Sequence, residues 1–307
     1  MPRTWSFAIA LALATWAVVA AMACGSSREG AWAQPVAPSR EARQPDAGQR
    51  REALLAEAEQ HWTNRGTEEE VRAAVSAWDR ATRMEPADHE SWVRLARAYY
   101  LLADGYLSFD ESKRDEFMTT HEQGIAAAEH ALVALSPDFG RRMQAGTRIE
   151  EALGTLDRSA VPALYWRSAN LGKWASAQGF ATVLSYKDEI RAVMQFCLER
   201  DEDYFFAGPH RYFGAFYARA PAFAGGDLTK SEFHFKRAIE RHPNYFATHV
   251  LYATDYAVKS QNRALYEERL NWVLNANPAT EPTVEPENRI EQRKAREAIA
   301  AAGDRFE

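Results

Sequence analysis

The stretch richest in reactive side chains is GPHRYFGAFYARAPAFAGGD, residues 208–227, where one histidine and two arginines stand among aromatics and glycines. Glycines beside cations would suit a loop that binds phosphate. Such a loop follows a strand and ends in Lys-Ser or Lys-Thr, and this stretch has neither feature. We therefore interpret it as packing sequence, in which glycine lets two helices approach each other closely.

Other patterns that could carry chemistry are incomplete. His121-Glu122 begins like the helix of a zinc protease, but Ile125 stands where the second histidine would be. No two histidines stand three or four residues apart, so no helix offers a paired metal site. The eight histidines are His61, His89, His121, His130, His210, His234, His242 and His249. Cys197 occupies a small packing position and is expected to be a buried, inert thiol. We predict no catalytic residue, no metal and no cofactor, and hence a protein that is not an enzyme.

The elements that position these residues are helices, because apolar residues recur at intervals of three and four. One spacing repeats: a small or apolar residue, a large one four later, a small one three later, then a proline. Its three complete copies are Ala74-x3-Trp78-x2-Ala81-x4-Pro86, Ser231-x3-Phe235-x2-Ala238-x4-Pro243 and Tyr266-x3-Leu270-x2-Val273-x4-Pro278. Partial copies start at Gly124 and Ile190. Small residues allow close helix contacts, and the proline ends a helix.

A second pattern accompanies the first, in Trp92-x2-Leu95-Ala96-x2-Tyr99, Phe213-Gly214-x2-Tyr217 and Tyr252-Ala253-x2-Tyr256. Together the two patterns resemble the tetratricopeptide (TPR) repeat, whose helical hairpins stack because each alone leaves an apolar face open. The sequence predicts an all-α, tetratricopeptide-like solenoid over residues 49–302, with about five hairpins plus a C-terminal helix. Two insertions interrupt it, between Tyr99 and Gly124 and from Asp138 to Ser159.

Within this scheme the stretch 208–227 receives a structural role. We predict that Pro209 starts the first helix of a hairpin, which runs from His210 to Ala220. Residues 221–226 form the turn. Thr229-x2-Glu232 is interpreted as a capping box that starts the second helix.

The N-terminus has the layout of a secretory signal over residues 1–23: Arg3, an apolar run, then Ala-Met-Ala before Cys24. Cys24 stands where a bacterial lipoprotein signal has its lipid-bearing cysteine, which predicts anchoring to a membrane through lipid on Cys24. An ordinary signal or an uncleaved membrane anchor is the alternative. Residues 24–48 are rich in Ala, Pro, Gly, Ser and Gln and are predicted to be a disordered tether with a reach of roughly 25–30 Å.

The charge pattern argues against a nucleic-acid partner. The formal net charge is −6, and no block of basic residues occurs along the chain.

The ordered part as a whole resembles the TatT family, the TPR-repeat lipoproteins that form the T component of TPR-associated TRAP transporters. The residues that carry the resemblance are ALYWRSANLGKWA and GPHRYFGAFYARAPAFAGGDLTKSEFHFKRAIERHPNY, within a match from about Gln49 to Pro278. The resemblance implies a periplasmic protein, anchored by lipid to the outer membrane, that docks the solute-binding protein of a TRAP uptake system and catalyses nothing. Self-association into a homo-oligomer is left open, and a general TPR scaffold lipoprotein of envelope assembly is the alternative function.

Solenoid geometry also predicts a partner or ligand groove. The first helix of each hairpin lines the concave face, on the side away from the residues that pack. The groove residues expected there are Arg97, Tyr100, Trp166, Asn170, Lys173, Trp174, Arg211 and Arg219. Cations between aromatics suit an acidic or amphipathic ligand or an acidic patch on a partner; ordinary solvated side chains are the alternative.

Overall fold

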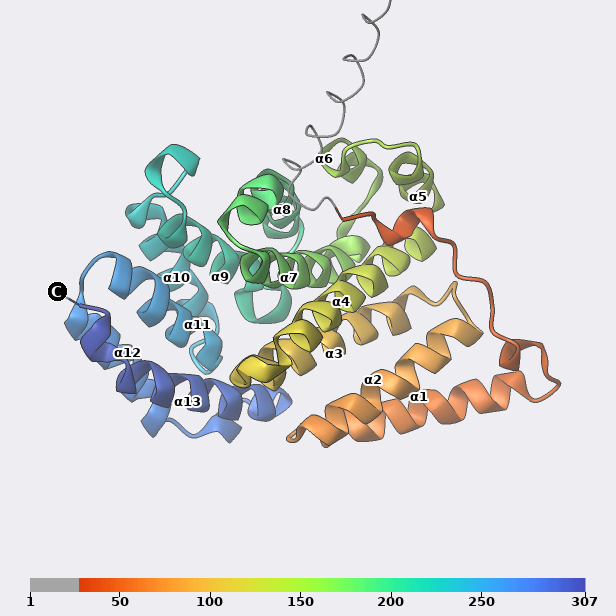
Figure 1. Cartoon of the computed structure of the whole chain (residues 1–307), viewed down its shortest axis with the longest axis horizontal. Coiled ribbons are helices and arrows are strands. Elements are labelled where there is room, and N and C mark those ends of the chain that lie inside the picture. The colour runs from red at the N-terminus through yellow and green to blue at the C-terminus, as the bar shows by residue number, and fades with distance from the viewer. Residues whose placement is uncertain (1–27, 307) are drawn as a thin grey trace, which may run out of the picture.

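A computed structural model of the chain describes residues 28–306, and these residues form stacked helical hairpins (Figure 1). The long helices are α1 (Ala47–Thr63), α2 (Glu68–Met84), α3 (His89–Gly105), α4 (Arg114–Leu135), α7 (Val161–Gln178), α8 (Phe180–Arg200), α9 (Tyr204–Arg219), α10 (Leu228–Arg241), α12 (Arg263–Asn275) and α13 (Glu285–Ala300). Shorter helices are α5 (Pro137–Gln144), α6 (Ile149–Ala152) and α11 (Phe246–Leu251), the last continuing into a π-helical segment, Tyr252–Ala257.

The predicted fold is confirmed as an all-α solenoid of helical hairpins. Four hairpins pair α1 with α2, α3 with α4, α7 with α8, and α9 with α10. In the fifth, α11 and its π-helical continuation together pack against α12, and α13 follows. The small positions of the repeated spacing lie at the helix contacts: a Cβ added to Gly214 on α9 would stand 2.8 Å from the Phe235 ring on α10. Helices α2, α10 and α12 each end shortly before the proline of the pattern.

In the hairpin of residues 208–227, the first helix starts close to its predicted position, but the second starts earlier than predicted. The regular part of α9 begins after Ala207, because Phe205, Phe206 and Ala207 have left-handed backbone angles. Helix α10 begins at Leu228, and its cap is Asp227, whose carboxylate accepts a hydrogen bond from the Lys230 amide. An aspartate in extended conformation at this position satisfies the first free amides, so the predicted capping box at Thr229 is wrong.

Part of the predicted tether contacts the folded domain. Residues 28–36, which we call the N-terminal strap, pack against the folded domain, and Ala31 is buried. Glu129 of α4 accepts hydrogen bonds from the Arg28 guanidinium at 2.7 and 2.9 Å and from the Ala31 amide at 2.6 Å. Trp32 packs edge-on against Phe139 of α5. The segment's composition suggested disorder, but contacts with a buried carboxylate and with an aromatic ring attach it to the domain.

The solenoid closes on itself, because α13 returns to the N-terminal helices (Figure 1). Glu287 of α13 binds Arg65, just beyond α1, and Arg97 of α3. Lys294 of α13 binds Asp104 of α3 at 2.8 Å. This closure places α3, α7, α9 and α13 around one cavity.

Two further sequence features are located here. Cys197 is fully buried, as predicted, and burial raises the pKa of its thiol. The signal segment 1–23 and Cys24 lie outside the described residues. Within residues 28–306, the helices are all too short or too polar to span a bilayer.

Candidate functional site: a cavity lined by arginines and aromatic side chains

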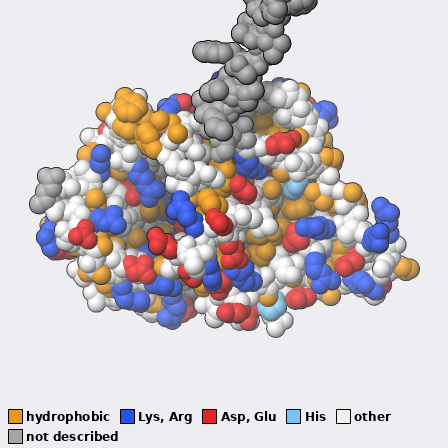
Figure 2. All heavy atoms as spheres, in the orientation of Figure 1, with side chains coloured by type: hydrophobic (Ala, Val, Ile, Leu, Met, Phe, Trp, Pro, Cys, Tyr) orange, Lys and Arg blue, Asp and Glu red, His pale blue; other side chains and the backbone are white. Residues whose placement is uncertain are grey.

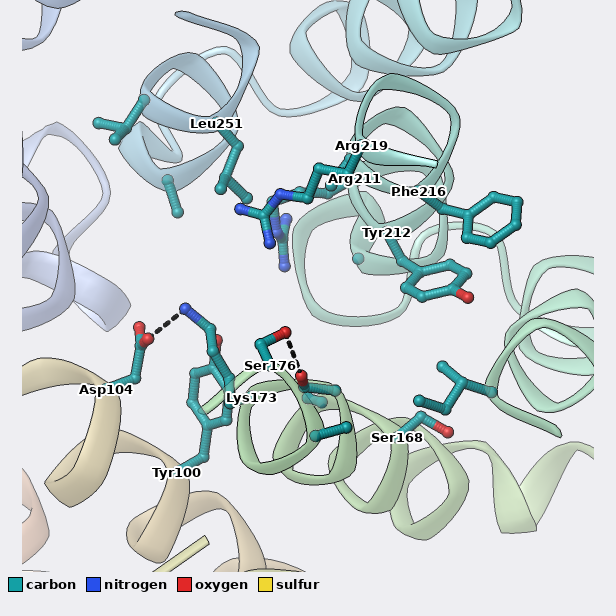
Figure 3. A pocket seen from close by; sticks show the side chains of 18 of the residues that line it. Tyr100, Asp104, Ser168, Lys173, Ser176, Arg211, Tyr212, Phe216, Arg219 and Leu251 are labelled. Atoms are coloured by element: carbon teal, nitrogen blue, oxygen red, sulfur yellow. Dashed lines mark hydrogen bonds and ion pairs between the residues drawn. The ribbon is translucent and has the colours of Figure 1, made fainter. Parts of the chain in front are cut away.

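A cavity with a volume of about 730 Å³ lies within the ring of helices. Its walls come from α3, α7, α8, α9, α11 and α13 (Figure 3). Six of the eight predicted groove residues line it: Arg97, Tyr100, Trp166, Lys173, Arg211 and Arg219. These six residues lie on α3, α7 and α9, the first helices of three hairpins, so the cavity brings together side chains that are far apart in the sequence.

Asn170 and Trp174 do not line the cavity. Asn170 is completely buried between helices, where its amide donates to the Ala96 carbonyl and its oxygen lies 2.8 Å from His121 Nδ1. The Trp174 indole N–H donates to Glu122 at 2.6 Å. Both residues belong to the interface between α7 and the preceding hairpin, because α7 is covered on more than one side.

Most cations of the cavity are paired with carboxylates. Arg97 donates to Glu287 at 3.1 Å, and Arg219 donates to Asp255 of the π-helical segment at 2.9 Å. Lys173 binds Asp104 (Figure 3), which also binds Lys294. Burial alone would raise the pKa of Asp104, but these two lysines lower it well below its usual range.

Arg211 is different, because its partners are neutral. Its side chain is almost fully buried, and its three hydrogen bonds go to the Phe206 carbonyl at 2.9 Å, the Tyr165 hydroxyl at 2.9 Å and the Phe205 carbonyl at 3.2 Å. The guanidinium lies 4.5 Å from the centre of the Tyr245 ring. Within residues 28–306 no carboxylate lies within ion-pair distance of Arg211.

The carbonyls that face Arg211 come from a strained segment. Phe205, Phe206 and Ala207 have φ values of 46°, 58° and 53°. Residues with a Cβ rarely adopt this left-handed backbone conformation, because it costs of order 1–3 kcal/mol per residue. It is often found at functional sites. The turn also places the Phe205 ring 4.6 Å from Trp166 and 4.8 Å from the Arg97 guanidinium.

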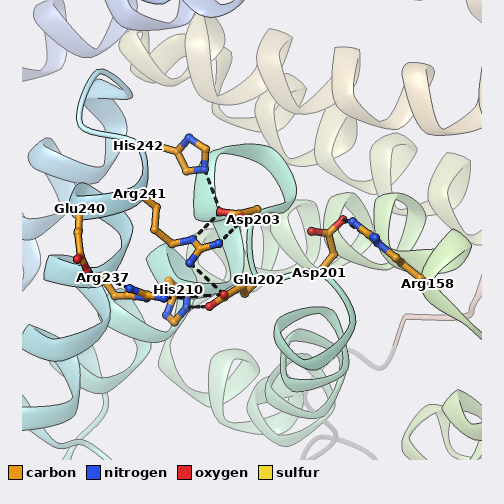
Figure 4. A network of polar contacts seen from close by, with 9 residues as sticks. All are labelled: Arg158, Asp201, Glu202, Asp203, His210, Arg237, Glu240, Arg241 and His242. Carbon is orange, nitrogen blue, oxygen red and sulfur yellow. Dashed lines mark hydrogen bonds and ion pairs between the residues drawn. The ribbon is translucent and has the colours of Figure 1, made fainter.

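A polar network on the other side of this segment holds it in place (Figure 4). Asp203, directly before α9, receives hydrogen bonds from Arg241 at the end of α10, and Arg241 lowers the pKa of Asp203 to about 2. Glu202 binds Arg241 at 3.0 Å and His210 at 3.1 Å. The network joins Glu202 and Asp203, just before the strained turn, to the end of α10. Arg211, which follows the turn, binds its carbonyls, so the turn is held by contacts from both sides.

Several cavity residues were not predicted. They are Asp104, Tyr165, Phe205, Tyr245, Glu287 and Lys294. Asp104 stands four residues after Tyr100 and seven after Arg97, so it lies on the same helix face one turn further on. Helix periodicity could therefore have predicted it as a cavity residue. Glu287, Glu291 and Lys294 share a face of α13, but the sequence does not indicate which distant helix this face contacts.

An apolar rim adjoins the cavity, consisting of Phe180, Pro221, Phe223 and Ala224. Phe180, Pro221 and Ala224 line the cavity. Phe223, in the same turn between α9 and α10, is 82% exposed, and Phe180 is 60% exposed. Figure 2 shows apolar side chains gathered at the upper left, over this turn. Exposed aromatics beside a cavity are typical of a binding surface.

Comparison with known protein families identifies the family of this chain. The family model of the TRAP transporter T-component matches residues 110–306, which include α4 to α13 and therefore most of the cavity wall. No curated protein matches the sequence.

Proposed function

Because this chain belongs to the TRAP transporter T-component family, we propose that it is a periplasmic accessory subunit that docks the solute-binding protein of a TRAP uptake system. The match over residues 110–306 carries the proposal, because those residues build most of the cavity wall and the whole apolar rim. In this proposal the protein performs no catalysis. Its cavity receives an acidic or amphipathic ligand next to the docked partner.

The proposed membrane attachment is lipid on Cys24, which places the protein at the outer membrane. Only three residues lie between Cys24 and Arg28, so Arg28 is four residue steps from Cys24, and Arg28 is fixed by its ion pair with Glu129. Four extended residues span at most about 14 Å. The lipid would therefore hold the folded domain much closer to the bilayer than a free tether would.

The proposed docking surface is the apolar rim rather than the cavity wall. Trp166 and Arg211 are 2% and 6% exposed, so a folded partner cannot contact them directly. Phe223 and Phe180 are exposed and can be buried by a partner, and aromatic side chains often dominate the binding energy of interfaces. A solute-binding protein docked at the rim would have its ligand beside the cavity mouth.

Site-specific photo-cross-linking in cells tests this surface. A photoreactive amino acid replaces Phe223 in one variant and Phe180 in another; a third carries it at Phe233, which is also 60% exposed but does not line the cavity. We expect the solute-binding protein encoded beside this gene to be captured from positions 223 and 180 and not from 233. Capture of envelope-assembly proteins instead would favour the scaffold function, and capture only from 233 would exclude the rim.

A further inference from the structure

We infer that the cavity is a binding site for a monoanionic amphipathic molecule, whose acidic group is bound by Arg211 and the hydroxyls of Tyr100 and Tyr245. The inference deepens the proposed function, because it names the chemical class of the ligand that the subunit would receive. It is carried by three features of the cavity: an unneutralised cation, free hydroxyl donors and an apolar wall.

The first feature is the charge of Arg211. A buried cation is costly unless an anion or several hydrogen bonds compensate it. The other cations that line the cavity each contact a carboxylate: Arg97, Lys173, Lys187, Arg219 and Lys294. Arg211 is only 6% exposed, and among the described residues its hydrogen bonds go only to two carbonyls and a hydroxyl. The charge missing from its surroundings is that of one anion.

The second feature is the set of donors around this guanidinium. A guanidinium has five N–H donors, and three hydrogen bonds are formed within residues 28–306. The strained turn occupies two of these donors with the Phe205 and Phe206 carbonyls, which fixes the direction of the fork. The remaining donors are available to a ligand.

Two tyrosine hydroxyls complete the donor set. Tyr100 and Tyr245 line the same cavity, and neither hydroxyl has a hydrogen-bond partner among the described residues. Burial raises the pKa of both phenols, so they stay protonated and can donate. The Arg211 guanidinium lies 4.5 Å from the centre of the Tyr245 ring, and Tyr100 lines the same cavity. The low dielectric of such a buried site strengthens bonds to an anion.

The third feature is the far wall of the cavity, which is apolar. Tyr212 and Phe216 of α9 lie on the side away from Asp104 and Lys173 (Figure 3). Helix α8 adds an aliphatic stripe, made of Val183, Leu184, Ile190 and Met194. Lys187 of α8 also lines the cavity but is paired with Asp188, so a second acidic group would find no unpaired cation on this side. The site therefore favours a single acid group joined to an apolar body.

Binding of three ten-carbon probes tests the inference. The full chain, purified from membranes into phospholipid nanodiscs, is titrated with decanoate, decan-1-ol and decanedioate, with empty nanodiscs as the blank. We expect decanoate to bind, and both the alcohol and the diacid to bind about tenfold more weakly or worse, because the alcohol lacks the charge and the diacid buries a second one. Equal affinity for decanoate and decan-1-ol, tighter binding of the diacid, or no decanoate binding would overturn the inference.

Variants locate the acid group. Arg211→Gln should weaken decanoate binding about tenfold or more. Because this change also removes the hydrogen bonds from Arg211 to the strained turn, Tyr100→Phe/Tyr245→Phe serves as a second variant. It keeps both rings and removes only the free hydroxyls, and we expect a loss of about tenfold. Lys236→Gln, at a cation outside the cavity that is paired with Glu232, is the matched control and should bind decanoate as wild type does. Unchanged binding in the double tyrosine variant would contradict the assignment.

The same samples separate this inference from the proposed docking. The double tyrosine variant should still bind the neighbouring solute-binding protein, and Phe223→Asp should still bind decanoate. Decanoate binding without any docking would refute the docking proposal and leave the anion site supported. Docking without decanoate binding would refute the anion site alone.

Discussion

At the residue scale, the cavity is defined by how completely its charges are compensated. Four predicted cations reach the cavity, but three of them are held by Glu287, Asp104 and Asp255. Composition and helix periodicity show which cations share a face, whereas pairing depends on helices that meet only in the folded chain. Arg211 could therefore be predicted as a cavity residue but not singled out as the one without a carboxylate.

Histidine burial at this scale predicts a dependence of stability on pH. Burial lowers the pKa of His121 to about 4, although its hydrogen bond with Asn170 acts in the opposite direction. Between pH 6.5 and 4 the unfolded chain binds more protons at this residue, so the free energy of unfolding falls as the pH falls. For this histidine the loss between pH 7 and pH 5 is about 2 kcal/mol.

Denaturant unfolding at pH 7 and pH 5 measures this effect in the wild type and in His121→Gln. The variant can keep a hydrogen bond to Asn170 but cannot titrate, so its stability should depend less steeply on pH. The same pH dependence in both proteins would mean that His121 is not responsible.

At the element scale, the spacing of small and large residues predicted the helices and their pairing, because hairpin packing is local in the sequence. Gly214 against Phe235 is such a contact. The left-handed turn before Gly208 was not predictable, since three residues with side chains adopt it only because Arg211 and the Asp203 network hold it. The N-terminal strap was missed for a similar reason: its attachment depends on Glu129, about a hundred residues away.

The N-terminal strap should be released when its buried partner loses its charge. Glu129→Gln leaves Arg28 and Arg167 without a shared carboxylate, and breaking such a buried pair costs about 3 kcal/mol or more. Hydrogen exchange of residues 28–36 and a thermal melt measure the change. Asp138→Asn, at an exposed carboxylate paired with Arg141 and Arg142, should change neither. Unchanged exchange in Glu129→Gln would show that Trp32 alone holds the strap.

At the scale of the whole molecule, ion pairs between α13 and the N-terminal helices close the solenoid around the cavity. Glu287 lies between Arg65 and Arg97, and Lys294 lies between Asp104 and Glu291. Repeats stacked side by side do not require such closure, so the sequence predicted a groove where the structure has a cavity. The closure explains why Trp166 and Arg211 are inaccessible to a folded partner.

Removing the charge of Glu287 should open this closure. Glu287→Gln leaves two arginines facing each other, at a cost of about 3 kcal/mol, and α13 should separate from α3. Small-angle scattering should show a larger radius of gyration, and the melting temperature should fall. Glu285→Gln, in an exposed pair with Arg289 on the same helix, is the control and should have little effect. Identical scattering profiles for the two variants would show that apolar contacts alone keep the ring closed.

The most direct measurement of the central proposal is a calorimetric titration of the full chain, in nanodiscs, with the TRAP solute-binding protein encoded beside it. We expect saturable binding to the wild type, binding about tenfold weaker or worse to Phe180→Asp/Phe223→Asp, and unchanged binding to Phe233→Asp, because each 1.4 kcal/mol lost at the interface is a factor of ten. No binding to the wild type would contradict the proposed function. Wild-type affinity in the double variant would contradict docking at the apolar rim.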